Sequence, residues 1–319
     1  MRCWGSRPAI WAYAQGRALK FSTKQTRTKL YGEIKEIHDE VERKFQKFKN
    51  FDILGHYPYD HHFVRSRSGR PRRIESEWEF IRARLPPEPK GLAVGSIFVR
   101  VYDQRIDLMS VMIVGRESAP YHQGLFFFDI FFPSNYLKLP QETQDVPSLF
   151  SHSFGFDLNP NLRKDGTVSI DKTQKSKNTM ELLSSLKDLV VNDKTYIHYS
   201  QKGLKLNRKV FMQTFEAMLK MLEWPPRPFK DFVPGYFRTR AHGILLNFKA
   251  RADIDEDNVM RTLFFKLVRA FEANGTYCGH HYNQKQYDQA LKEEEELLNQ
   301  SREKYGYGFK ARDWLYFGV

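Results

Sequence analysis

Three strand-length apolar segments follow one another between residues 96 and 132, and they restrict the possible folds more than any other feature. Polar or glycine- and proline-containing stretches separate these segments, SIFVRVY, DLMSVMIVG and LFFFDIFF. Connections this short join antiparallel strands, because parallel neighbours need a crossover of a dozen or more residues. We therefore predict an antiparallel meander, completed by a fourth strand near residues 146–150.

Helical patterns precede this meander. Apolar side chains recur at steps of three and four over residues 29–48, which predicts one amphipathic helix. A second helix is expected at about 74–85, where Pro86 and Pro87 stop it. Between the two helices, residues 52–73 carry glycine, proline and charge without periodicity, and we predict a loop there.

Helical patterns also follow the meander. Asn178 precedes Glu181 by three residues, which is the pattern of a capping box at the start of a helix. A further helix is expected at about 208–223, and most of the last hundred residues have helical patterns. The predicted fold class is therefore α+β, with the helices segregated from one antiparallel sheet.

The chain carries a formal net charge of +13, but much of the excess is local. Seven lysines or arginines and no acidic residue precede Glu33, and five arginines lie between Arg65 and Arg73. We expect these residues to flank the folded part rather than to form a nucleic-acid-binding face on it. The basic start of the chain is either a disordered tail or an organellar presequence.

The chain has two cysteines, Cys3 and Cys278, so no disulfide framework can form. This favours a reducing compartment, and we expect a cytoplasmic or nuclear protein. No apolar run approaches the roughly 18 residues of a membrane span. A soluble protein without a membrane partner is therefore expected.

Two short segments contain residue types that bind metals. They are Asp60-His61-His62, with His56 nearby, and the segment of Cys278, His280 and His281. A structural zinc site takes four well-spaced ligands, and neither segment supplies them. We therefore predict no metal site and no cofactor, and we expect the first segment to have a structural or surface role.

Ser169 is followed at the third position by Lys172, which matches the S-x-x-K pattern of some acyl-transferring enzymes. That pattern is informative only beside S-D-N and K-T-G elements, and the sequence contains neither. The phosphate-binding and dinucleotide-binding glycine motifs are absent as well. We interpret the S-x-x-K match as coincidental.

The segment YHQGLFFFDIFFPSNY, followed by LNPNLRKDGTVS, resembles the core of the ubiquitin-conjugating enzymes. In that family a strand ending in Phe-Pro leads to a His-Pro-Asn turn, and a cysteine stands eight residues past its last Asn. The turn Asn159-Pro160-Asn161 is more similar to the large conjugating enzymes of plants and to the animal conjugating-ligating hybrids. FKNFDILGHYPYDHHF, DFVPGYFRTRAHGIL and FFKLVRAFEANGTYC extend the similarity over roughly residues 46–280.

The resemblance implies a fold and a chemistry. The family fold has an N-terminal helix, a four-stranded antiparallel meander, an active-site loop and C-terminal helices. The family cysteine takes the C-terminus of ubiquitin as a thioester and yields it to an amine or a ligase cysteine. The last Asn of the turn stabilises the oxyanion. By position, Asn161 corresponds to this Asn and Ser169 corresponds to the cysteine.

The sequence departs from the family pattern at two points. A hydroxyl stands at position 169 where the family has a thiol, and the sequence offers no recognisable base for it. The loop that follows, IDKTQKSKN, leads directly into the helix at 179, so about a dozen residues and both tryptophans of the subgroup pattern are missing. A changed nucleophile beside a shortened loop predicts that the thioester-forming step is lost.

We therefore expect a ubiquitin-conjugating-enzyme-like protein that acts by non-covalent binding. Its expected partners are ubiquitin or a ubiquitin-like protein, a ubiquitin ligase, or an active conjugating enzyme. One alternative is an active ubiquitin transferase that uses Ser169 or a displaced cysteine, and a second is a basic nucleic-acid-associated protein.

The resemblance and the helical patterns also suggest how the chain is divided. We expect a basic tail at 1–28, a helix-and-loop extension at 29–73, a conjugating-enzyme-like core with trailing helices at 74–250, and a C-terminal helical extension at 251–319.

Overall fold

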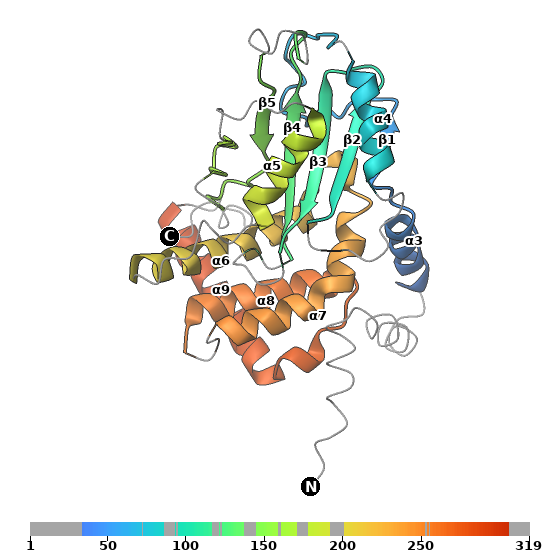
Figure 1. Ribbon diagram of the computed structural model, residues 1–319. Coiled ribbons are helices and arrows are strands. Elements are labelled where there is room, and N and C mark those ends of the chain that lie inside the picture. The colour runs from blue at the N-terminus through green and yellow to red at the C-terminus, as the bar shows by residue number, and fades with distance from the viewer. Residues whose placement is uncertain are drawn as a thin grey trace. The chain divides into compact units, whose positions relative to one another are not determined.

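The protein contains one five-stranded sheet and a set of helices, which confirms the predicted α+β class (Figure 1). The computed structural model describes residues 34–71, 73–85, 93, 95–116, 121, 123–136, 145–158, 161–170, 178–191, 201–252, 254 and 256–305. The proposed basic tail, residues 1–28, lies outside these ranges. The chain forms two compact units, Asp39–Tyr236 and Met1–His38 with Phe237–Val319, and each is described separately below.

The sheet of the first unit has the strand order β1-β2-β3-β4-β5 (Figure 1). Strands β2 (Ile97–Tyr102), β3 (Leu108–Val114), β4 (Leu125–Phe131) and β5 (Ser148–Ser151) pair antiparallel in sequence order. This is the meander predicted from the spacing of the apolar segments, including its fourth strand.

The prediction of a loop over residues 52–73 is wrong at its start. Phe51–Leu54 forms strand β1, which pairs parallel to β2, with Phe51 opposite Val99. The backbone N–H of Val99 donates to the carbonyl oxygen of Asn50 over 2.7 Å. Four residues show no period of their own, so this strand forms because an open sheet edge accepts it.

Two helices cover one face of the sheet. Helices α4 (Ile74–Arg84) and α5 (Thr179–Val191) lie side by side on this face (Figure 1). The backbone N–H of Thr179 donates to Oε2 of Glu77 over 2.7 Å and joins the two helices. Asn178 accepts a hydrogen bond from the Glu181 N–H over 2.9 Å, as expected for the start of α5.

The opposite face of the sheet is also covered. Phe48 lies against Phe98 of β2, and Phe229 of η3 (Arg227–Phe229) lies against Phe127 of β4, with ring centroids 6.0 and 5.5 Å apart. Every residue of β2 and β3 is buried as a consequence. Neither face of the central strands is therefore available to a binding partner.

Helix α6 (Gln201–Glu223) and part of helix α3 (Ile34–Gln46) also belong to this unit. Helix α3 lies within the predicted span of 29–48. Its residues from Asp39 onward belong to this unit, where Phe45 packs against Phe232 with ring centroids 5.0 Å apart. Helix α6 begins before the predicted residue 208, and it buries Phe211 and Phe215.

The second unit is helical in its described part. It contains most of α7 (Val233–Arg251), then α8 (Asn258–Ala273), η4 (Gly279–His281) and α9 (Gln284–Tyr305). Asp257 caps α8 by accepting hydrogen bonds from two backbone N–H groups. Phe248 of α7 packs on Phe264 of α8, with ring centroids 5.7 Å apart. No helix in the described ranges is long and apolar enough to cross a membrane.

Candidate functional site

Residues 161–169 form a small hairpin that carries Asn161 at one end and Ser169 at the other. The backbone N–H of Ser169 donates to the carbonyl oxygen of Asn161 over 2.9 Å. One step inward, Leu162 and Val168 form an antiparallel bridge. The two residues selected from the sequence therefore lie opposite one another across the hairpin.

The turn of this hairpin requires a glycine at position 166. The φ angle of Gly166 is +84°, and a Cβ atom there would lie 2.0 Å from Cε2 of Phe150. Only glycine combines this left-handed backbone with so close an approach. The N–H of Ser151 donates to the Gly166 carbonyl over 2.8 Å, so the turn is fastened to the end of β5.

The segment after β5 holds the other side of the turn through Lys164. The backbone N–H of Lys164 donates to Oδ1 of Asp157 over 2.9 Å, and its carbonyl oxygen accepts from the Ser153 hydroxyl over 3.0 Å. From α6, Nζ of Lys220 donates to the carbonyl oxygen of Phe154 over 2.9 Å. These bonds restrain the backbone that presents Asn161 and Ser169.

The side chain of Ser169 is half-buried. Among the residues that the structure describes, no histidine or carboxylate is hydrogen-bonded to its Oγ atom. A serine hydroxyl becomes a useful nucleophile only beside such a base. Asn159 and Pro160 of the turn lie outside the described residues, and so do residues 171–177 of the shortened loop.

Cys278 lies far along the chain from this hairpin, between α8 and η4, and is completely buried. Its Sγ donates to the carbonyl oxygen of Thr276 over 3.5 Å. Burial raises the pKa of the Cys278 thiol well above its ordinary value, so the reactive thiolate is not populated near neutral pH. Cys3 lies outside the described residues.

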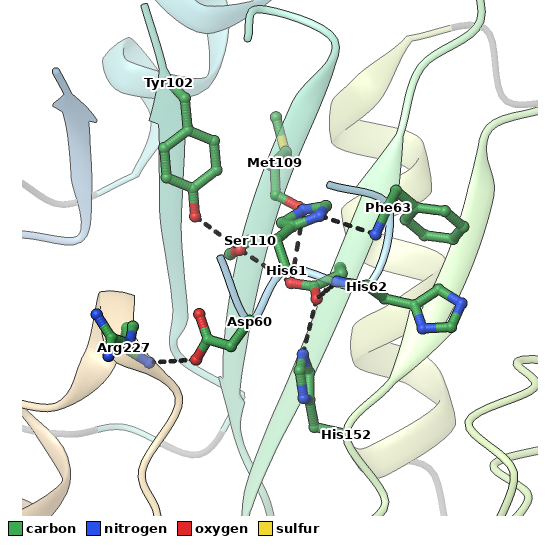
Figure 2. Close-up of polar contacts among 10 residues, drawn as sticks. Asp60, His61, His62, Phe63, Tyr102, Met109, Ser110, His152 and Arg227 are labelled. Atoms are coloured by element: carbon green, nitrogen blue, oxygen red, sulfur yellow. Dashed lines mark hydrogen bonds and ion pairs between the residues drawn. The ribbon is translucent and has the colours of Figure 1, made fainter. Parts of the chain in front are cut away.

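The Asp60-His61-His62 segment meets a buried carboxylate that the sequence analysis did not select, Asp129 of β4. The backbone N–H of His62 donates to Oδ2 of Asp129 over 2.8 Å, and Nε2 of His61 lies 3.6 Å from its Oδ1. His152 completes the group, with its Nε2 atom 2.8 Å from Oδ2 of Asp129. Figure 2 shows that the ring of His62 points away from this group, so His62 contacts Asp129 through its backbone N–H while its ring stacks on Phe150. The sequence signal that could have identified Asp129 is a single aspartate inside the otherwise apolar strand LFFFDIF.

The pKa values indicate an ion pair between Asp129 and His152. Burial alone would raise the pKa of Asp129, but the hydrogen bond with His152 and the adjacent imidazoles hold it below its ordinary value. Burial opposes the charge on His152 as well, yet its hydrogen bond to Asp129 raises its pKa. Burial lowers the pKa of His61, which is therefore the neutral member of the group.

A chain of hydroxyl groups ends at the same carboxylate. The Tyr102 hydroxyl donates to Oγ of Ser110 over 2.8 Å, and Ser110 donates to Oδ1 of Asp129 over 2.9 Å (Figure 2). Asp129 thus accepts bonds from Ser110, His62 and His152. A buried carboxylate satisfied in this way ties strands and loop together. This arrangement favours the structural role expected for Asp60-His61-His62.

A small cleft lies beside this group, and its volume of about 10 Å³ is roughly that needed to hold one water molecule. Its walls include Asp60, His152 and Phe229, and the N–H of Arg227 donates to Oδ2 of Asp60 over 3.1 Å. Ligand pockets usually enclose about 300–1,000 Å³. We therefore assign no ligand to this cleft.

The second segment with metal-ligand residue types is arranged differently from the sequence pattern. His280 and His281 of η4 come together with His242 of α7, and one ring nitrogen from each of the three lies within 4.8 Å of the other two. Burial lowers the pKa of His242 to about 2 and that of His281 to about 3, so both rings are neutral. Cys278 is not part of this group. His242 was missed because it stands 38 positions before His280 in the sequence.

Comparison with known proteins identifies the family. No protein-family model matches the chain. The chain is 30% identical over 253 residues to the protein named ubiquitin-conjugating enzyme E2 39 from Arabidopsis thaliana, covering 69% of this chain and 74% of the relative. It is also 30% identical over 261 residues to ubiquitin-conjugating enzyme E2 23 of the same plant, covering 72% of this chain.

An animal protein matches over a shorter range. The human dual E2 ubiquitin-conjugating enzyme/E3 ubiquitin-protein ligase BIRC6 is 35% identical over 103 residues, which are 32% of this chain and 2% of the relative. The chain spans only 22–35% of the length of three of its plant relatives. It belongs to the ubiquitin-conjugating enzyme (E2) family, and its α+β core is the fold of that family.

Proposed function

We propose that this E2 family member does not form the thioester intermediate and acts in the ubiquitin pathway by non-covalent binding. The observation that carries the proposal is the hairpin at 161–169. Its backbone pairs Asn161 with Ser169, the positions that the family resemblance assigns to the oxyanion donor and the nucleophile, but residue 169 bears a hydroxyl. The identification of Ser169 with the family's cysteine position is part of the proposal.

The chemistry of serine supports this assignment. A serine hydroxyl has a far higher pKa than a thiol and attacks acyl groups efficiently only with an adjacent base. No such base touches Ser169 within the described residues. An oxyester of ubiquitin would also be a poorer acyl donor than a thioester, so transfer to an amine would be slow.

A displaced cysteine does not rescue the reaction in our proposal. The Cys278 side chain has no exposed surface, and burial raises its pKa. A conjugating thiol must instead be accessible to the activating enzyme and present as thiolate.

We propose ubiquitin or a ubiquitin-like protein, a ubiquitin ligase, or an active conjugating enzyme as the partner. Since both faces of the central strands are covered, the partner would bind to the hairpin, the helices or the sheet edges. This restriction follows from the complete burial of β2 and β3.

A binding titration tests the proposal. The full chain is immobilised and exposed to ubiquitin, an active conjugating enzyme, or duplex DNA at two salt concentrations. We expect saturable binding of a ubiquitin-pathway protein that is equal for the wild type and Ser169→Ala. Binding of DNA alone, with a steep loss at higher salt, would instead support a nucleic-acid-associated protein.

A further inference from the structure

Three imidazole rings converge in the unit that contains α8 and α9. His242 comes from the middle of α7, whereas His280 and His281 form most of η4. The closest pair of nitrogens, Nδ1 of His242 and Nε2 of His281, is 2.6 Å apart, and the ligand atoms of all three lie within 4.8 Å of one another. The ring of His280 stacks on that of His242, with centroids 4.6 Å apart.

The separations of the three nitrogens lie on either side of the value expected for a tetrahedral cation site. Zinc binds imidazole nitrogen at 2.0–2.1 Å, which places two tetrahedral ligand atoms roughly 3.3 Å apart. Nδ1 of His242 and Nε2 of His281, 2.6 Å apart, lie closer than this distance. The largest separation among the three nitrogens, up to 4.8 Å, exceeds it by ~1.5 Å. Because the lone pair of an imidazole nitrogen lies in the plane of its ring, His280 would have to rotate out of its stack on His242 for both rings to bind one ion.

The backbone around the three rings is held from both sides. The guanidinium of Arg238 on α7 donates two hydrogen bonds to the carbonyl oxygen of Asn274, at 2.9 and 2.7 Å. Nζ of Lys249 donates to the carbonyl oxygen of His281 over 2.6 Å, and the N–H of His281 donates to the carbonyl oxygen of Cys278 over 2.8 Å. The turn that carries two of the rings is therefore tied to the helix that carries the third.

The ligand types restrict which cation can bind. The cluster offers nitrogen atoms and contains no carboxylate, so it does not suit Mg²⁺ or Ca²⁺, which require oxygen ligands. The ammonium group of Lys249 bonds to the backbone of His281, and its positive charge opposes any bound cation, so the imidazole–metal bonds must outweigh this repulsion. Imidazole lone pairs instead favour divalent d-block ions such as zinc, nickel or copper.

We propose that His242, His280 and His281 bind one divalent d-block cation, represented by Zn²⁺, through three imidazole nitrogens. His280 is exposed whereas the other two are buried, so water can occupy a fourth position on its side. The bound ion would fasten η4 to α7. This site is independent of the proposed function of the hairpin.

Metal titration of the full chain, prepared without a histidine tag, tests the proposal. We expect one equivalent of Zn²⁺ to bind in competition with a chromogenic chelator and to raise the Tm. One equivalent of Co²⁺ should give the visible absorption bands of a tetrahedral site, without a thiolate charge-transfer band. These spectra report the ligand set without reference to any activity.

Single substitutions assign the ligands. His280→Gln changes an exposed side chain and should leave folding intact. It should weaken Zn²⁺ binding by more than about 100-fold, because losing even a residue that only hydrogen-bonds to a ligand costs about 10–100-fold in metal affinity. His56→Gln, which alters an exposed histidine in the other unit, is the matched control and should bind like the wild type.

Three results would overturn the proposal. The first is the absence of stoichiometric Zn²⁺ binding, which would leave only a hydrogen-bonded pair of histidines. The second is equal affinity in His280→Gln and the wild type. The third is a Co²⁺–thiolate band, which would replace the three-imidazole ligand set by one that includes Cys278.

Discussion

The N–H of Ser169 donates a hydrogen bond to the carbonyl oxygen of Asn161 across a hairpin of the E2 core, over 2.9 Å. This bond fixes the distance between the residues that the family resemblance assigns to the nucleophile and the oxyanion donor. In our account, the chemistry is lost through the side chain and the following loop, and the scaffold is retained.

The substitution Gly166→Ala should lower the free energy of unfolding by disturbing the hairpin. Alanine at a φ of +84° costs about 1 kcal/mol in backbone strain, and the clash with Phe150 adds about 1–3 kcal/mol. Gly155→Ala is the matched control, because Gly155 has a φ of +85° but its added Cβ would have no neighbour closer than 4.0 Å. Urea unfolding measures both variants, and equal losses of stability would contradict the required close approach.

The Asp129–His152 pair should make stability depend on pH in a defined way. Burial works against the charge on His152, but its hydrogen bond to Asp129 raises its pKa. A raised pKa stabilises the fold fully below the unfolded value of about 6.5 and ceases to do so as pH rises through the folded value. The lowered pKa of Asp129 contributes stability that is fully present above its unfolded value of about 3.9 and is lost as pH falls through the lower folded value.

His152→Gln tests this window. The substitution should lower the free energy of unfolding by about 1.5–3 kcal/mol at a pH of about 5.5, and by less at a pH of about 8.5, since it removes a charge-assisted hydrogen bond. Buried neutral histidines such as His61 shift stability in the opposite direction. Subtracting the free energy of unfolding of the variant from that of the wild type at each pH removes that contribution, since both proteins contain His61. A difference that grows with pH would refute the ion pair.

The start of α8 should depend on Asp257. Its carboxylate accepts hydrogen bonds from the N–H groups of Val259 and Met260, both at 3.1 Å. Asp257→Ala should therefore cost about 1 kcal/mol, whereas Asp257→Asn, which keeps the acceptor, should cost much less. Thermal unfolding of the two variants provides the comparison. Equal destabilisation would show that charge and not capping is responsible.

Restoring the thiol should not be sufficient for activity. Ser169→Cys introduces a thiol at the position that we propose for the nucleophile but leaves unchanged the following loop, which we expect to be shortened. We therefore expect little thioester formation with activating enzyme, ATP and ubiquitin. Thr167→Cys, on an exposed position of the same hairpin, controls for non-specific reaction of an added thiol. Efficient charging of Ser169→Cys alone would show that the loop is not impaired.

The sequence was sufficient to predict the meander, because each apolar run is bounded by polar or glycine-containing stretches and needs no distant information. Strand β1 was missed since its four residues become a strand only by pairing with β2, whose partner residues lie 48 positions further along the chain. Helix α5 was placed correctly because Asn178 supplies a local start signal that the structure confirms.

Side-chain clusters were harder to predict than the sheet. Asp129, His152 and His61 come from three separate segments, and they meet only because the loop after β1 folds over the sheet. The same limit applies to His242, which joins His280 and His281 through the packing of α7 against η4. The pairing of Asn161 with Ser169 is local, and a family pattern was enough to select both residues.

The most direct test of the account is intact-mass spectrometry of the wild-type chain after incubation with activating enzyme, ATP and ubiquitin. We predict that the mass stays that of the free protein, while an active conjugating enzyme in the same mixture gains one ubiquitin. An adduct that resists thiol, is released by hydroxide and is absent from Ser169→Ala would contradict the account, because it would show that Ser169 accepts ubiquitin.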